Sequence, residues 1–174
     1  IVHDNLMAAI GQVMGDAITP EIAKGWSEAV MGLAHILIDA ETSLRATYAA
    51  REGGWTGWRE FRVASKKVVG DTTLLDFVPA DGSQSPFEFT PGQYLTINLN
   101  GTDGEGDAVA PRHYTVTSAP GETKLSCAVR AVKGGVVSNR IMKELQEGDV
   151  VTLTPPCGVF TASPDAVLVS AGIG

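Results

Sequence analysis

The stretch Pro111-Arg112-His113-Tyr114-Thr115-Val116-Thr117-Ser118 places a cation, an aromatic ring and a hydroxyl within four successive residues. Side chains alternate between the faces of a β-strand, so Arg112 and Tyr114 are expected on one face and His113 and Thr115 on the other. An arginine fork suits phosphate oxygens, a tyrosine lies well against a flat ring, and a threonine hydroxyl can reach a ring heteroatom. These properties suit a ligand with a phosphate at one end and an aromatic system at the other. Taken by itself, the stretch fits better as a half-buried strand with a solvated arginine.

Length and composition indicate a chain with a packed core. The chain has 174 residues, of which 44% are hydrophobic and 19% charged, enough for one domain or slightly more. The net charge of −7 argues against nucleic acid or an anionic membrane as a partner. No apolar run approaches the length of a membrane span. Two cysteines allow at most one disulfide, so a reducing cytoplasm is the expected compartment.

The residues at the two ends of the chain predict that it is part of a longer protein. The chain starts at Ile1, with no methionine and no helix start signal. It ends at Gly172-Ile173-Gly174, directly after an apolar, strand-like run from Asp165 to Ser170. A strand followed by Gly-x-Gly is how a dinucleotide-binding turn begins. We therefore expect residues 165–174 to be the start of a truncated NAD-binding α/β domain.

Residues 1–52 are expected to be helical, with helices at about residues 3–14 and 20–51. Thr19 is a suitable N-cap for the second helix, and Pro20 fits its first position. Gly53-Gly54 ends the helical pattern.

The longer helix carries an apolar stripe that is interrupted by one carboxylate. Its positions recur every three or four residues and are Ile22, Trp26, Ala29, Val30, Leu33, Leu37, Glu41, Leu44 and Tyr48. Because a buried, unpaired carboxylate costs several kcal/mol, Glu41 on this face predicts a partner. Alternatively, the stripe has already left the core and Glu41 is solvated. The residues alone favour neither interpretation.

After Gly53-Gly54 the hydrophobic period changes from helical to strand-like. Six short strands are expected in residues 56–164, at 61–69, 72–78, 94–99, 111–118, 124–132 and 150–154. A helix from about Ser138 to Gln146 is expected to close one end of the sheet. The fold class is therefore α+β, with two helices followed by a six-stranded antiparallel Greek-key β-barrel and one capping helix.

Two further motifs accompany the opening stretch. In Gly134-Gly135-Val136-Val137-Ser138, two glycines precede a helix, where the backbone can approach a ligand and N–H groups favour an anion. Ser138 is expected either to cap this helix or to donate to a phosphate. Paired glycines before a helix are common, but together with Arg112 this element suits a pyrophosphate. The other motif, Pro91-Gly92-Gln93-Tyr94, supplies a tyrosine at the start of a neighbouring strand.

The order Pro-Gly-Gln-Tyr, Arg-x-Tyr-Thr, Gly-Gly-x-x-Ser and Gly-x-Gly resembles the ferredoxin-reductase-like flavoproteins, whose barrel binds FAD. The resemblance implies that Arg112 holds the FAD phosphate, Tyr114 packs on the isoalloxazine and Thr115 hydrogen-bonds near flavin N5. It also implies FAD contacts from His113 and Tyr94. The implied pyrophosphate site comprises Gly134, Gly135, Val136, Val137 and Ser138. The family more often has serine at the position of Thr115, so the hydroxyl is kept and a methyl group is added.

The residues ahead of the barrel narrow the resemblance to the flavohaemoglobins. In these proteins a haem-binding globin domain is fused to an FAD barrel and an NAD(P)-binding domain. The match rests on Trp26 and Glu41 in a long helix, followed by Gly53-Gly54-Trp55-x-Gly57 and Phe61-Arg62-Val63. It implies that residues 1–52 are the last two globin helices. In that family a glutamate pairs with the proximal haem histidine, and Glu41 falls at its position.

For the parent protein, the resemblance implies a nitric oxide dioxygenase. NAD(P)H would reduce FAD, electrons would pass to haem b, and nitric oxide and dioxygen would become nitrate. The proximal histidine is expected outside this chain, which would itself act mainly as an FAD-binding module. Two alternatives remain. One is an FAD-dependent electron-transfer component of another oxygenase, for which the helical start is unexpected. The other is a non-enzymatic β-barrel binding module, whose Arg112 face would be dry and unliganded.

Overall fold

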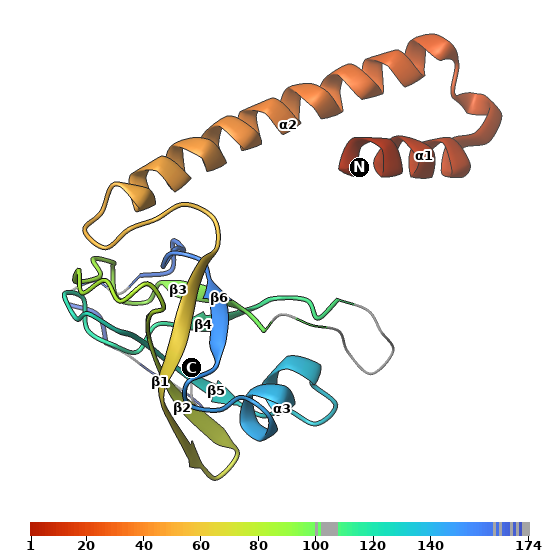
Figure 1. Ribbon diagram of the computed structural model, residues 1–174. Coiled ribbons are helices and arrows are strands. Elements are labelled where there is room, and N and C mark those ends of the chain that lie inside the picture. The colour runs from red at the N-terminus through yellow and green to blue at the C-terminus, as the bar shows by residue number, and fades with distance from the viewer. Residues whose placement is uncertain are drawn as a thin grey trace. The chain divides into compact units, whose positions relative to one another are not determined.

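The computed structural model describes residues 1–99, 101, 108–161, 163, 165–167, 169 and 171. Two compact units make up the chain, Ile1–Arg45 and Ala46–Gly174. The division lies inside the long helix rather than at Gly53-Gly54, and the boundary expected after residue 52 stays a prediction. Figure 1 shows the elements in chain order.

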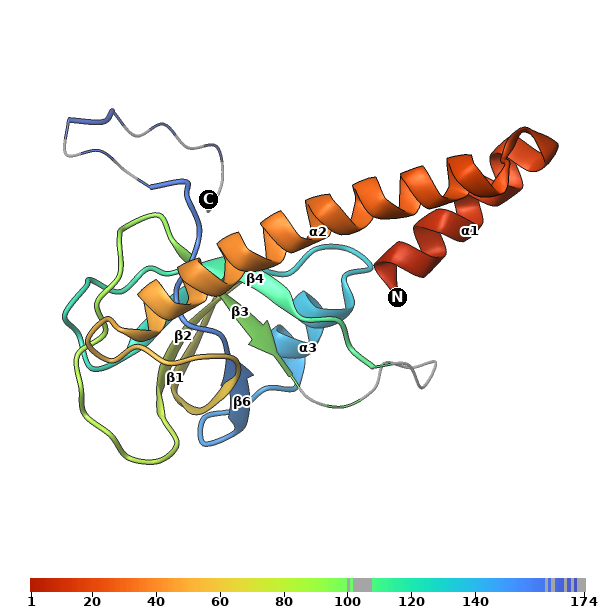
Figure 2. The same cartoon turned by 90° about the horizontal axis from the view of Figure 1, so that it is seen from above.

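The first unit is built from two helices. α1 (Val2–Met14) leads through the short 3-10 helix η1 (Gly15–Ala17) into α2 (Pro20–Ala49), and α1 folds back beside α2 (Figures 1 and 2). The backbone N–H of Ile22 donates to the Thr19 hydroxyl over 3.3 Å, so the predicted N-cap is confirmed. Half-buried positions recur every three or four residues along both helices, at His3, Met7, Ile10, Ala23, Ser27, Val30 and Ala34. His3 Nε2 lies 2.9 Å from Ser27 Oγ and joins the two helices.

The second unit contains a six-stranded antiparallel sheet, as predicted. Its strands are β1 (Arg59–Val69), β2 (Thr72–Pro79), β3 (Tyr94–Asn98), β4 (Arg112–Thr115), β5 (Leu125–Arg130) and β6 (Val150–Leu153). Their order across the sheet is β4-β3-β6-β1-β2-β5. The β1 and β2 pair is a hairpin around Gly70, whose φ of 60° favours glycine at the turn.

The two edges of this sheet come together. β4 and β5 stand at opposite ends of the strand order, yet Val116 and Cys127 form an antiparallel bridge. Next to this bridge, the backbone N–H of Thr117 donates to the carbonyl of Ser126 over 2.8 Å. The sheet therefore curls until its first and last strands meet.

Alternating residues of the strands form one hydrophobic core. Phe61, Phe77, Leu95, Ile97 and Leu125 are fully buried in it. Burial of one such side chain contributes about 1.5–3 kcal/mol, so this core holds β3 and β4 firmly in place. Three aromatic rings pack together at this core: the ring centroid of Trp55 lies 5.2 Å from that of Phe61 and 6.0 Å from that of Phe87.

The helix that follows β5 begins earlier than predicted. α3 spans Val136–Lys143, whereas the sequence suggested Ser138 to Gln146. Gly135 takes the N-cap position, so Ser138 lies inside the first turn. Val137 and Ile141 are the apolar side chains that α3 buries.

The far end of the chain is described only in part. Of the strand predicted from Asp165 to Ser170, residues 165–167 and 169 are described, and none of these is in a strand. Leu168, Ser170 and the Gly172-Ile173-Gly174 turn lie outside the described residues. In the described part of the chain, no helix is both long and apolar enough to cross a membrane.

Candidate cofactor-binding site

The pairing of β3 with β4 decides which predicted site residues share a face. Tyr94 pairs with Thr115, and Thr96 pairs with His113. Directly opposite residues of an antiparallel pair lie on the same face. Tyr94, Thr96, His113 and Thr115 therefore form one surface, which we call the Tyr94 face.

The Tyr94 face combines an aromatic wall with polar groups. The rings of Tyr94 and His113 are 4.5 Å apart between centroids and inclined by 51°. His113 Nδ1 lies 2.9 Å from the hydroxyl of Thr96, which is buried. This contact fixes the orientation of the imidazole, while His113 and Thr115 themselves stay exposed. The Tyr94 face thus presents two aromatic rings beside the exposed side chain of Thr115.

The other side of β4 faces the core. Tyr114 pairs with Leu95 and Arg112 with Ile97, and both partners are fully buried. Tyr114 packs against the core, and this burial raises the pKa of its phenol to about 12. Arg112 lies at the exposed start of the strand, where its Nη1 donates to the carbonyls of Ala110 (3.1 Å) and Pro111 (3.0 Å). The predicted alternation of side chains is present, and it places Tyr114 and Thr115 on opposite faces.

The segment after β6 contacts both the backbone and the ring of Tyr94. Tyr94 and Cys157 exchange two backbone hydrogen bonds, each 2.9 Å long. A Cβ on Gly158 would lie only 2.9 Å from Tyr94 Cε1, so the ring packs directly on this glycine. The neighbouring thiol of Cys157 raises the pKa of the Tyr94 phenol. Both cysteines are free; Cys157 is half-buried, and Cys127 is a core residue.

The Gly134-Gly135 turn is tied to the first residues of α3. Ser138 is buried, and its hydroxyl accepts the backbone N–H of Val132 over 3.3 Å. Of the two roles expected for Ser138, capping the helix is wrong: Gly135 is the N-cap, and the Ser138 hydroxyl contacts Val132 near the end of β5. A Cβ on Gly135 would lie 2.6 Å from Val132 Cγ2 and 2.7 Å from Ser138 Oγ. The turn therefore requires glycine at position 135, and the first N–H groups of α3 have no partner within the helix, as at any helix start.

The strand register brings Arg112 and this turn to the same end of the sheet. The bridge between Val116 and Cys127 pairs β4 with β5 in antiparallel register. Because the two strands run in opposite directions, the start of β4 at Arg112 and the end of β5 at Arg130 point toward the same end of the sheet. Two elements suited to phosphate thus belong to the same end of the sheet, although Arg112 and Gly134 are 22 positions apart in the sequence.

The sequence predictions missed one residue next to Tyr94. Gln93 is 2% exposed, and its side chain makes three hydrogen bonds. Its presence in the Pro-Gly-Gln-Tyr motif was the available signal. Its partners were not visible in the sequence, because Arg51 and Gly158 are 42 and 65 residues away.

Glu41 lies among exposed apolar side chains on α2. Its carboxylate accepts the Nε–H of Arg45 over 3.0 Å, and its side chain is 60% exposed. The exposed apolar residues of the same helix are Ile22, Trp26, Met31, Leu33, Ile36, Leu37, Ile38 and Leu44.

Among the residues that the structure describes, no group of three His, Cys, Asp or Glu side chains is arranged to hold a metal.

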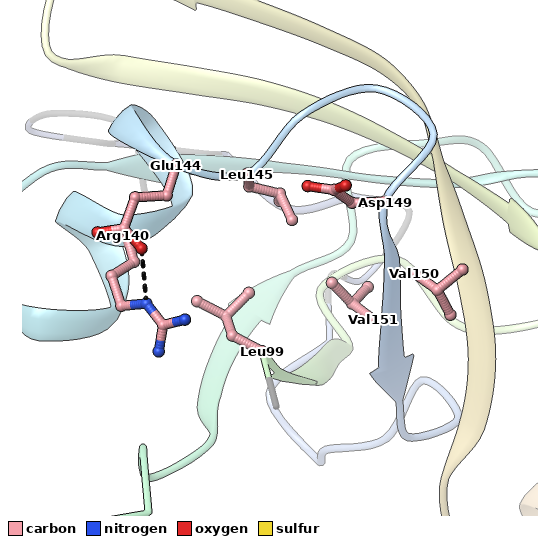
Figure 3. A pocket seen from close by; sticks show the side chains of 7 residues that line it. All are labelled: Leu99, Arg140, Glu144, Leu145, Asp149, Val150 and Val151. Carbon is pink, nitrogen blue, oxygen red and sulfur yellow. Dashed lines mark hydrogen bonds and ion pairs between the residues drawn. The ribbon is translucent and has the colours of Figure 1, made fainter. Parts of the chain in front are cut away.

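A separate pocket of about 310 Å³ lies between α3 and β6. Its apolar lining consists of Leu99, Leu145, Val150 and Val151. Arg140, Glu144 and Asp149 supply its polar groups, and Arg140 Nε donates to Glu144 over 3.1 Å (Figure 3). None of the residues predicted for the site lines this pocket.

Known proteins resemble the chain over both units. Residues 60–161 match the family described as "Oxidoreductase FAD-binding domain". A flavohemoprotein of Bordetella pertussis is 37% identical over 183 aligned residues, which cover the whole chain and 45% of that protein. A flavohemoprotein of Rhodopirellula baltica is 36% identical, again over the whole chain. The chain thus spans about half the length of these relatives.

Two solved structures extend the comparison. A flavohemoglobin from Malassezia yamatoensis with bound FAD and heme has a TM-score of 0.75 and 27% identity, over 92% of this chain and 39% of that chain. The FAD/NAD-binding domain of a nitric oxide dioxygenase from Vibrio cholerae has a TM-score of 0.54 and 28% identity, over 60% and 46%. The chain is similar to flavohemoproteins along its whole length, and it belongs to the oxidoreductase FAD-binding domain family.

Proposed function

We propose that the six-stranded sheet is a Greek-key barrel that binds FAD with its β4 strand and its Gly134-Gly135 turn. One observation supports this proposal: the antiparallel bridge between Val116 and Cys127 means that the start of β4 with Arg112 and the end of β5, which leads to that turn, point toward the same end of the sheet. A guanidinium next to a helix start is a suitable place for a pyrophosphate, because both favour anions.

The phosphate end of the site fits FAD. Arg112 uses Nη1 for two neighbouring carbonyls, and a guanidinium has five N–H donors, so others can take phosphate oxygens. Gly134 and Gly135 keep side chains away from the turn, and Val136, Val137 and Ser138 supply the N–H groups of a helix start. Because the Ser138 hydroxyl already bonds Val132 N, we assign its backbone, rather than its hydroxyl, to the phosphate.

The Tyr94 face fits the flavin ring. Tyr94 and His113 offer a wall that shields one side of a flat ring from water, and the Thr115 hydroxyl offers a hydrogen bond to a ring nitrogen. Tyr114 lies on the opposite face of β4 and packs against the core, so we assign the flavin ring to Tyr94, His113 and Thr115 rather than to the expected contact with Tyr114. When bound, FAD accepts hydride and releases electrons one at a time. The residues of this chain bind the cofactor, orient its ring and exclude water from it.

For the longer protein, the proposed activity is NAD(P)H-dependent nitric oxide dioxygenation, which converts nitric oxide and dioxygen to nitrate. Residues 1–52 would end its globin domain, with haem b held outside this chain and Glu41 as the partner of the proximal histidine. Residues 165–174 would begin its NAD(P)-binding domain. The alignment with flavohemoproteins over the whole chain, helices included, supports this function over an electron-transfer reductase. Two free cysteines support a cytoplasmic location, and the acidic net charge supports the absence of a nucleic-acid partner.

The site assignment is tested by two substitutions and their FAD affinities. Arg112→Ala is expected to weaken FAD binding about tenfold to a hundredfold, as expected for loss of charge-assisted hydrogen bonds. Lys124→Ala removes a cation that pairs with Asp76 instead and should leave the affinity unchanged. Equal effects of the two substitutions would remove Arg112 from the site. In the longer protein, Arg112→Ala should also slow NAD(P)H-dependent consumption of nitric oxide.

A further inference from the structure

We propose that Gln93 and Arg51 are positioning residues for the flavin, because together they hold Gly158 against the ring of Tyr94. The inference rests on the proposed binding of FAD at the Tyr94 face. Neither residue belongs to that face, and both act through backbone that supports it. Gln93 directly precedes Tyr94, and Arg51 follows the end of α2.

Gln93 joins three segments of the chain through its buried amide. Its Oε1 accepts the backbone N–H of Thr90 over 3.0 Å and Arg51 Nη1 over 2.9 Å. Its Nε2 donates to the carbonyl of Gly158 over 3.0 Å. A buried amide without partners would be costly, so these contacts restrict where Gly158 can lie. The position of Gly158 is therefore set from the start of β3.

Arg51 fixes the orientation of the Gln93 amide. Its guanidinium can only donate, so the oxygen of Gln93 must face it and the NH₂ group must face Gly158. The same guanidinium lies over the ring of Tyr48, 4.7 Å from its centroid, which holds the arginine in place. The chain of contacts runs from Tyr48 through Arg51 and Gln93 to Gly158.

A displacement of Gly158 would be passed directly to the flavin wall. The ring of Tyr94 packs on Gly158 with no room for a Cβ between them. On its other side the ring meets His113, 4.5 Å away between centroids. The segment is also held close at Gly92, where a Cβ would lie 2.6 Å from the carbonyl oxygen of Phe160. Tyr94 is thus clamped, and loosening Gly158 would tilt it against a bound ring.

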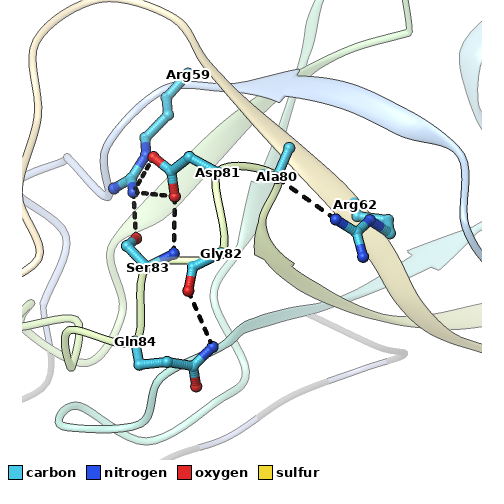
Figure 4. A network of polar contacts seen from close by, with 7 residues as sticks. All are labelled: Arg59, Arg62, Ala80, Asp81, Gly82, Ser83 and Gln84. Carbon is cyan, nitrogen blue, oxygen red and sulfur yellow. Dashed lines mark hydrogen bonds and ion pairs between the residues drawn. The ribbon is translucent and has the colours of Figure 1, made fainter.

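The experiment compares FAD bound to the full chain and to its variants. Gln93→Glu keeps an acceptor for Arg51 but places an oxygen where Gly158 needs a donor, and Arg51→Met removes the orienting cation. Arg51→Lys keeps a cationic donor and serves as the conservative rescue. Arg59→Met is the matched control: Arg59 also lies over aromatic rings, Trp55 and Phe61, but ties the turn at Asp81 and Ser83 (Figure 4).

Two quantities are measured, the dissociation constant for FAD and the visible circular dichroism of bound flavin. We expect Gln93→Glu and Arg51→Met to weaken FAD binding about fivefold to tenfold, as for one lost buried hydrogen bond, and to change the dichroism of the flavin bands. Arg51→Lys should restore most of both signals, and Arg59→Met should match the unaltered chain. A purely structural role would lower the melting temperature without changing the flavin bands.

The possible outcomes separate this inference from the proposed function. If the unaltered chain does not bind FAD, the proposed function fails, and the inference fails with it. If the unaltered chain binds FAD and Arg51→Met gives the same affinity and the same flavin bands, the inference alone is overturned. If Gln93→Glu does not fold, Arg51→Met still tests the inference. Arg51 is only half-buried, so its replacement is expected to leave the chain folded.

Discussion

The ring of Tyr94 lies on Gly158, and a methyl group on that glycine would come within 2.9 Å of the ring. The two residues are far apart in the sequence but adjacent in the fold, because Tyr94 and Cys157 pair through their backbones. The contact gives Tyr94 a fixed support beside His113 and Thr115. The proposed flavin wall therefore depends on a residue that carries no side chain.

Gly158→Ala should weaken both the fold and FAD binding. The φ of Gly158 is 119°, and alanine there is strained by about 1–3 kcal/mol in addition to its collision with Tyr94. Gly148→Ala is the control, since Gly148 has a φ of 94° and open space around it. Denaturant titration and FAD titration check both variants. FAD affinities that fall equally in both would contradict a specific role for the contact with Tyr94.

Gly135→Ala tests the phosphate end without backbone strain. The φ of Gly135 is −74°, so alanine fits the backbone, but its Cβ would press on Val132 and Ser138. Such overpacking costs about 1–3 kcal/mol and should shift the turn that faces the pyrophosphate. Gly134→Ala is the comparison, because Gly134 has a positive φ of 75° but a Cβ there would meet no other atom within 4 Å. We expect FAD affinity to fall further for Gly135→Ala than for Gly134→Ala, and the reverse order would exclude Gly135 as the critical glycine.

Thiol labelling should distinguish the two cysteines and report on the cofactor. Burial raises the pKa of the Cys127 thiol to about 12, so it should not react in the folded protein. Cys157 is half-buried beside Tyr94 and should react with Ellman's reagent. Because bound FAD would cover the Tyr94 face, it should slow this reaction. Cys157→Ser should abolish labelling of the folded protein, and a labelling rate unaffected by saturating FAD would argue against flavin at this face.

Asp76 makes part of the stability dependent on pH. Burial raises the pKa of its carboxyl, but hydrogen bonds from Ser126 (2.6 Å) and Lys124 (2.9 Å) outweigh it and hold the pKa below the ordinary 3.8. The stabilisation is therefore present above pH 3.8 and is lost as the pH falls through the lower, folded pKa. Asp76→Asn should lower the free energy of unfolding at pH 7 by about 1 kcal/mol, and by less at pH 3. An equal difference at both pH values would show that the carboxylate charge contributes nothing.

Local patterns predicted most of the second unit. The two hairpin strands β1 and β2 follow from alternating apolar residues on either side of Gly70-Asp71. In the first unit, the Thr19 cap follows from its neighbour Pro20. The alternation in β4 was also predicted, and the burial of Val116 agrees with it. These features depend on residues that are close in the sequence.

What could not be predicted depends on distant partners. The sequence did not indicate which face of β4 meets the core, because Leu95 and Ile97 on β3 decide it. Ser138 has the propensity of an N-cap, yet its hydroxyl bonds Val132 and the helix begins at Val136. Gln93 was overlooked, since its role appears only when Arg51 and Gly158 are brought beside it.

The most direct test of FAD binding is a fluorescence titration of FAD with the full, unaltered chain. The proposed site predicts saturable binding of one FAD per chain, with a change in flavin fluorescence as Tyr94 and His113 approach the ring. The same titration with Arg112→Ala should need a higher protein concentration for half-saturation. Flavin fluorescence that stays constant over the whole titration, with FAD recovered free after gel filtration, would contradict the account.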